Sequence, residues 1–201
     1  MFATKRSRIR ALALTGSLVA AGVTVGAVTF NASAAETTVA TSAAASNTNA
    51  VAPVVNAIPE AIRPPAGSRP VGAYVVTTGT QNYTCAATGT YPTTSTPEAQ
   101  LLGTGGRIHH FAGPTWQSVR DNSLVTAKKA KESARTGTIA ELLLEVTSHS
   151  GKGVLSKADW INRLYTSGGV APTTPCTPGQ TVQVPYQALY VFWDDPAVPA
   201  V

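Results

Sequence analysis

The chain of 201 residues lacks the short motifs that mark several common catalytic and nucleotide-binding sites. It has no Gly-x-Ser-x-Gly nucleophile elbow, no His-Glu-x-x-His zinc motif and no phosphate loop ending in Gly-Lys-Ser/Thr. The glycine cluster 103–106 fails as a dinucleotide fingerprint, because Ile108 stands where the third glycine belongs and a strand-like segment follows. We interpret these glycines as a turn that leads into a strand.

Acidic residues are absent before Glu36, whereas the first ten residues carry four basic ones. An uncharged run from 11 to 30 follows, and Ala32-Ser33-Ala34 is a small-x-small cleavage pattern. This order predicts a secretory signal peptide over residues 1–34 and a secreted, extracellular or cell-envelope protein. The alternative is a retained membrane anchor, since the run is long enough to cross a bilayer. Its Gly, Thr and Ser content and the cleavage pattern favour cleavage.

Strong charge of either sign is absent once the signal is removed. The formal net charge of +5 comes from 15 Lys+Arg and 10 Asp+Glu, and losing four bases leaves 11 against 10. This near-neutral balance argues against a nucleic-acid partner, and cleavage argues against stable membrane insertion. We interpret the short basic run 128–131 as a solvated face.

Cysteine is scarce, with only Cys85 and Cys176 in the chain. An even number in an exported protein predicts one disulfide. The bond would close a loop of about 92 residues and stabilise the fold by about 4–5 kcal/mol on the chain-entropy model. It would also leave no free thiol to act as a nucleophile.

Residues 58–195 have the pattern of a single β domain. Residues 35–57, rich in Ala, Thr, Ser and Asn, predict a disordered spacer, and 196–201 a loose tail. Short β-branched and aromatic runs alternate with Gly, Pro, Asn, Asp and Ser clusters, which predicts an all-β antiparallel β-sandwich or barrel with little helix. The expected strands lie at 71–77, 82–85, 123–126, 139–146, 160–165, 181–184 and 188–193. Segment 139–146 is apolar on both faces and is expected to be a central strand, with a short helix as the alternative.

Histidine is also scarce, and His109 and His110 are adjacent. Neighbouring residues of a strand point to opposite faces, so these two side chains could not easily share one metal ion. His149 is the only other imidazole, so we expect no metal site and no cofactor. One of the pair is expected to be exposed and the other half-buried and hydrogen-bonded.

The acidic residues show no spacing typical of a paired-carboxylate catalytic site. Asp121-Asn122 has the composition of a turn, with Asn able to adopt the left-handed conformation. Asp194-Asp195 follows the last expected strand and is interpreted as a solvated end. Glu141 and Glu145 are interpreted as the exposed ends of a leucine run.

One set of segments resembles the DUF3455 family, a domain of unknown function. Residues 110–116 with 121–123 are similar to its G-x-H-Y-A-G-P-x-W…D-G-S pattern. Further similar segments occur in order over about residues 58–193, at 79–85, 97–99, 139–144, 161–172, 176 and 184–192. The departures are His109, which stands outside the pattern, Phe111 in place of Tyr, Ala140-Glu141 in place of Pro-Trp, and Asn162 in place of Gln.

The resemblance implies an exported β-rich protein without an established activity. The matched residues with distinctive chemistry are His110, Trp116, Arg163 and Tyr186, which we expect to line an aromatic cleft. The leading hypothesis is a non-catalytic extracellular or envelope-associated module that binds a small molecule or a glycan. One alternative is a hydrolase or lyase with His110 as general base, oriented by an acid such as Glu98 or Asp121. Another is a purely structural domain.

Overall fold

The computed structural model describes residues 57–199. The predicted signal peptide and all of the predicted spacer except Ala57 lie outside the described residues, as do the last two residues of the predicted tail. Nothing in the described part therefore tests the predictions for the N-terminal segments.

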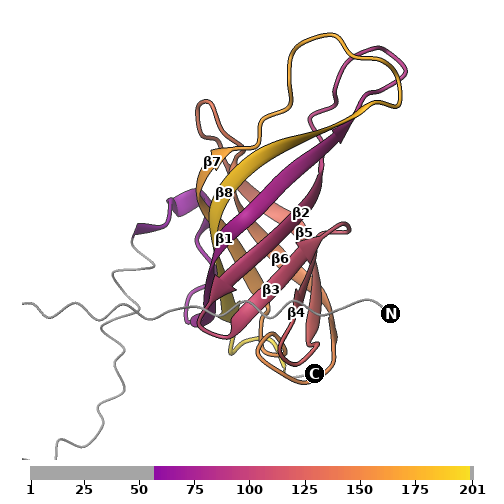
Figure 1. Ribbon diagram of the computed structural model, residues 1–201. Coiled ribbons are helices and arrows are strands. Elements are labelled where there is room, and N and C mark those ends of the chain that lie inside the picture. The colour runs from indigo at the N-terminus through magenta and orange to yellow at the C-terminus, as the bar shows by residue number, and fades with distance from the viewer. Residues whose placement is uncertain (1–56, 200–201) are drawn as a thin grey trace, which may run out of the picture. The chain divides into compact units, whose positions relative to one another are not determined.

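Eight antiparallel strands form a closed barrel in which each strand pairs with its neighbours in sequence (Figure 1). A 3-10 turn, η1 (Glu60–Ile62), precedes them. The strands are β1 (Arg69–Thr84), β2 (Thr96–Gly103), β3 (Gly106–Phe111), β4 (Thr115–Ser118), β5 (Leu124–Ser133), β6 (Glu141–Ser150), β7 (Trp160–Gly168) and β8 (Thr181–Asp194). The all-β prediction is confirmed, and of its two architectures the barrel is the correct one. The leucine run lies in β6, so it is a strand rather than a helix.

Alternating side chains of the strands fill the barrel interior. Tyr74, Leu101, Ile108, Ile161 and Phe192 are all almost fully buried in one core cluster. Because successive residues of a strand face opposite sides, the intervening residues lie on the outer wall. An interior of eight strands is just wide enough for packed side chains or one small ligand.

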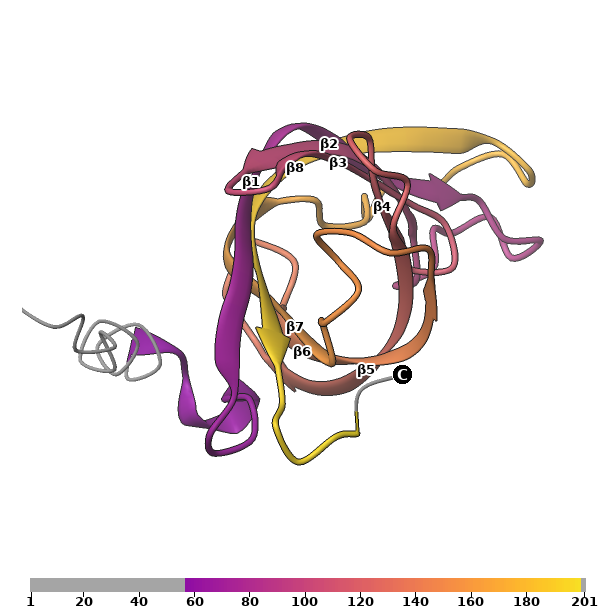
Figure 2. The same ribbon diagram turned by 90° about the horizontal axis from the view of Figure 1, so that it is seen from below.

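The loop between β6 and β7 closes one end of the barrel. Leu155 and Ala158 of this loop are fully buried in the interior cluster. Asp121 and Ser123 hold it, since their side chains accept hydrogen bonds from the backbone N–H of Val154 (3.1 Å) and Leu155 (3.2 Å). Figure 2 shows the orange loop lying across the ring of strands. Asp121 is thus the predicted turn acid, and Asn122 has the predicted left-handed backbone, with φ of 59°.

The segment before β1 packs on the outside of the barrel. Ile58 and Ile62 form a second core cluster with Leu164 and Trp193. Asn162 of β7 connects η1 with β8. Its Nδ2 donates to the Ile62 carbonyl at 2.8 Å, and its Oδ1 accepts from Trp193 Nε1 at 2.9 Å. The fully buried amide is therefore satisfied on both sides.

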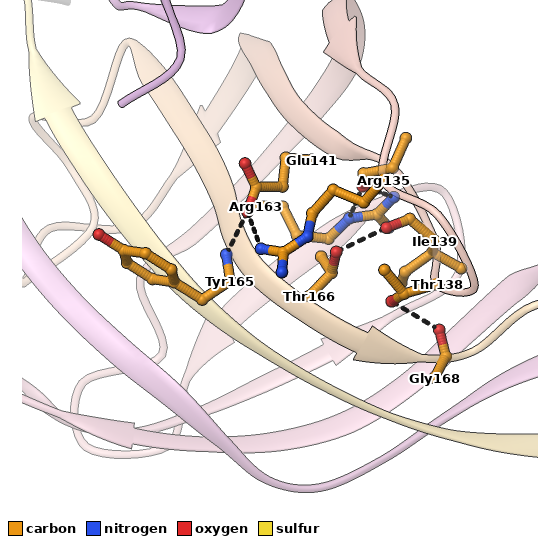
Figure 3. Close-up of polar contacts among 9 residues, drawn as sticks. Arg135, Thr138, Ile139, Glu141, Arg163, Tyr165, Thr166 and Gly168 are labelled. Carbon is orange, nitrogen blue, oxygen red and sulfur yellow. Dashed lines mark hydrogen bonds and ion pairs between the residues drawn. The ribbon is translucent and has the colours of Figure 1, made fainter. Parts of the chain in front are cut away.

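Two acids that were expected at exposed ends are buried instead. Glu141 is 5% exposed, and its carboxylate accepts from Arg135 Nη1 at 2.6 Å and from the Tyr165 N–H at 2.7 Å (Figure 3). Tyr165 lies in a bulge of β7 with φ of 50°, so its N–H is not used by the strand ladder. Asp195 is 4% exposed and accepts from Trp160 Nε1. The predictions for Glu141 and Asp195 are wrong because both carboxylates are buried while accepting hydrogen bonds from donors elsewhere in the chain.

β1 and β8 continue together beyond the other end of the barrel, where the disulfide lies. Their pairing runs to Thr84 and Thr181, and Cys85 follows directly. Cys85 and Cys176 are bonded, with Cα atoms 6.0 Å apart, which confirms the predicted disulfide. The bond joins the loop after β1 to the loop before β8.

Among the helical residues that the structure describes, none forms a stretch long and apolar enough to span a bilayer.

Replacing both Cys85 and Cys176 with serine should lower the free energy of unfolding by about 2–5 kcal/mol, because the unfolded chain regains the freedom of a 91-residue separation. Urea denaturation of the oxidised protein and the double variant measures the difference. A loss below about 1 kcal/mol would contradict the loop-entropy argument.

Candidate functional site

The barrel interior contains a cavity of about 120 Å³ at the level of β3 and β4, which we call the inner cavity. Its wall combines the apolar side chains of Leu142 and Leu144 with a few polar and aromatic groups. The polar and aromatic groups of the wall include Gln81, His110, Trp116, Arg163 and Tyr190. An apolar cavity with a few converging polar groups is typical of small-molecule sites.

A second, more open cavity of about 310 Å³ adjoins the first, and we call it the outer cavity. The two share Gln81, Ser95, Leu142 and Arg163 in their walls. The rest of the outer wall comes from the β1–β2, β5–β6 and β7–β8 connections, together with Tyr83 of β1 and with Lys129 and Glu132 of β5. Because β6 runs antiparallel to its neighbours, this mouth is at the end of the barrel opposite the β6–β7 loop.

His110 lies in the interior and is neutral. Burial lowers the pKa of its imidazole to about 3. The hydrogen bond with the Thr115 backbone acts in the opposite direction, and electrostatic repulsion from Arg163 and His109 lowers the pKa further. Its Nδ1 lies 2.9 Å from the Thr115 carbonyl, which can only accept, so Nδ1 carries the proton and Nε2 has the free lone pair. Its ring stacks on Trp116 with a centroid distance of 4.2 Å and an interplanar angle of 6°.

His109 points to the outer wall, as the strand pattern predicts. Its side chain is about one third exposed and lies 2.7 Å from Glu98. His110 is 3% exposed, so it is more deeply buried than expected. Within the described residues no group of three or more metal-ligating side chains converges.

Arg163 faces the cavities from β7. It shares a face of that strand with Ile161, which belongs to the interior core. Its Nε and Nη2 both donate to the Ala140 carbonyl, at 3.1 and 2.8 Å, which fixes the plane of the guanidinium (Figure 3). Thr166 donates to the Ile139 carbonyl beside it at 2.6 Å, so the β5–β6 connection is firmly held against β7.

Gln81 is a wall residue that the sequence analysis did not identify. β1 contains a bulge between Val76 and Thr78, and this bulge changes which residues face inward. Tyr74 and Val76 face the interior before it, whereas Gln81 and Tyr83 are buried after it. Gln81 lies in the resembling segment 79–85, so its place in that pattern was the signal that could have identified it.

The aromatic residues of the site differ in their position. Trp116 lines the inner cavity and is 1% exposed. Tyr186 is buried behind the wall, with its hydroxyl 3.3 Å from that of Tyr190, which does line the cavity. Burial raises the pKa of both phenols, so both are neutral hydrogen-bonding groups.

Of the four residues expected to line a cleft, the structure brings His110, Trp116 and Arg163 to one cavity and places Tyr186 in contact with that wall. The acids expected to orient His110 are elsewhere. Glu98 pairs with His109, and Asp121 accepts from Ser123 Oγ at 2.6 Å in its turn. The expectation that Glu98 or Asp121 orients His110 is therefore wrong.

The burial of neutral His110 predicts a pH-dependent stability. Because its pKa is about 6.5 in the unfolded chain and about 3 in the folded one, the unfolded state binds the extra proton between these values. The contribution of neutral His110 to the free energy of unfolding is fully present above pH 6.5. It falls as the pH decreases toward 3, by up to about 1.4 kcal/mol per pH unit. Urea denaturation of wild type and His110→Gln between pH 7 and 4 should show a flatter slope in the variant. His109→Gln is the matched control, and equal slopes in all three proteins would refute the assignment.

Comparison with known proteins gives a family match that includes these site residues. The family model described as "Protein of unknown function (DUF3455)" matches residues 105–194, which include His110, Trp116, Arg163 and Tyr186. No curated protein and no solved structure matched in the other comparisons. The resemblance deduced from the segments at 110–116, 139–144, 161–172 and 184–192 is thus confirmed, and the chain carries a DUF3455 family domain at residues 105–194.

Proposed function

We propose that this β-barrel domain is a secreted, non-catalytic binding module that holds a small molecule inside its barrel. The observation that carries the proposal is the continuity of the inner and outer cavities. They lead from an open mouth to the buried His110–Trp116 stack, while the β6–β7 loop fills the opposite end. Eight-stranded barrels of this width can enclose one small ligand.

The geometry supports binding more than catalysis. A general base works best when its pKa is near the working pH, whereas that of His110 is about 3. Its Nδ1 is held by a backbone carbonyl rather than by a carboxylate that would stabilise the imidazolium. His110 is better suited to bind a ligand through its neutral Nε2 than to remove a proton from it.

A small molecule fits the site better than a glycan. Sugars are commonly bound against an exposed aromatic face. Trp116 offers none, because His110 covers one face and the rings of Tyr190 and Phe192 meet it at steep angles. The inner cavity of about 120 Å³ is also too enclosed for a chain of sugar rings.

An extracellular or envelope location is part of the proposal. It is supported by the N-terminal sequence pattern and by the Cys85–Cys176 bond, since structural disulfides are typical of oxidising compartments.

Filling the cavity should abolish binding. Leu142 lies in the walls of both cavities, so Leu142→Trp should place an indole in the ligand's space. A screen of small fragments by ligand-observed NMR should give hits for the wild type, and their affinity should fall at least tenfold in the variant.

Leu102→Trp is the matched control, because Leu102 is 50% exposed on the outer wall of β2. It should bind the same fragments as the wild type. A screen without hits, or hits that survive Leu142→Trp, would refute the proposal and favour a purely structural domain.

A further inference from the structure

We propose that the inner cavity is selective for a small monocarboxylate that carries an apolar group, with Arg163, Trp116 and Gln81 as the donors to its carboxylate. This inference rests on the proposed function, since it requires that the barrel takes up a small molecule.

Within residues 57–199, two buried donors in the cavity wall have no hydrogen-bond partner. The indole Nε1–H of Trp116 is inaccessible to solvent, and among the described residues nothing accepts its hydrogen bond. Gln81 is 3% exposed, and its Oε1 accepts from Ser95 Oγ while its Nε2 has no acceptor. A buried polar group without a partner costs about 1–3 kcal/mol, so an acceptor that reached both donors would bind favourably.

Arg163 adds a permanent positive charge to the same wall. A guanidinium stays protonated, and that of Arg163 is partly buried. In residues 57–199 the acids that form ion pairs do so with other bases. The Ala140 carbonyl orients Arg163 through two hydrogen bonds but supplies no negative charge. The wall therefore holds one oriented cation that lacks a counterion.

The remaining wall residues leave this charge uncompensated. No acidic residue of the described part of the chain lines the inner cavity, and His110 is neutral there. In the outer cavity Lys129 and Glu132 pair with each other at 2.7 Å. The combined walls thus carry one net positive charge, which matches a monoanion. A dianion would leave one of its charges without a partner inside the barrel.

The rest of the wall favours an apolar group next to the carboxylate of the ligand. Leu142, Leu144 and two prolines, Pro97 and Pro114, surround the donors with apolar surface. The inner cavity holds only a few heavy atoms, and a larger apolar group would extend into the outer cavity of about 310 Å³. Carboxylates suit the donors, because an anionic oxygen makes stronger hydrogen bonds to N–H groups than a neutral one.

Benzoate, benzamide and benzamidine test charge selection, because they share one shape and carry negative, zero and positive charge. Calorimetric titration of the purified protein at neutral pH and constant ionic strength should give a Kd at least tenfold lower for benzoate than for benzamide. Benzamidine should not bind measurably. Propanoate, titrated in parallel, should bind and tests whether the aromatic ring is required.

Variants locate the donors. Arg163→Gln should weaken benzoate binding at least tenfold and reduce its preference over benzamide to less than threefold. Arg107→Gln removes the same charge from an exposed position of β3 and should leave both affinities unchanged. Trp116→Phe keeps an aromatic ring but removes the N–H, and it should also weaken benzoate binding. The comparison of the three probes on the wild type needs no variant and stands even if Arg163→Gln fails to fold.

The outcomes separate this inference from the proposed function. Equal binding of benzoate and benzamide, or fragment hits that are all neutral, would overturn carboxylate selection and leave a small-molecule site. No binding by either carboxylate and no fragment hits would overturn both this inference and the proposed function.

Discussion

The pairing of β8 with β1 is the constraint on which the rest of the structure depends. This pairing closes the sheet, with register from Arg69 opposite Asp194 to Thr84 opposite Thr181. A closed sheet has no free edges, and it creates an interior that side chains must fill. The two ends are filled differently. The β6–β7 loop inserts Leu155 and Ala158 at one end, whereas the other end leaves the two adjoining cavities.

Irregularities in the strands decide which polar residues reach those cavities. Before the bulge in β1, the even-numbered residues Tyr74 and Val76 face inward. After it the odd-numbered residues face inward, and Gln81 is one of them. The bulge in β7 gives Tyr165 a left-handed backbone and frees its N–H, which the buried Glu141 accepts. Glu141 is in turn paired with Arg135, so this acid does not neutralise Arg163. The Arg135–Glu141 ion pair is therefore distinct from the guanidinium that faces the cavity.

The electrostatics of the interior follow from burial. Removing His110 from water keeps its imidazole neutral, and its stacking on Trp116 fixes the ring. Arg163 cannot lose its charge in this way and instead is held by the Ala140 carbonyl. One neutral acceptor, one cation and two unpaired donors thus lie in the wall of one small, largely apolar cavity.

The sequence by itself determined the all-β class, the turn at Asp121-Asn122, the disulfide and the divergence of His109 from His110. Each depends on local information: the period of two along a strand, turn chemistry, or an even cysteine number. It also selected His110, Trp116 and Arg163, through their place in a resembling pattern. The tertiary structure decided between barrel and sandwich, because strand closure is a long-range pairing that no local pattern specifies. It also decided that Gln81 faces inward and that Glu141 and Asp195 are buried. Those positions depend on bulges and on unpaired donors from distant strands, which exist only once the barrel has closed.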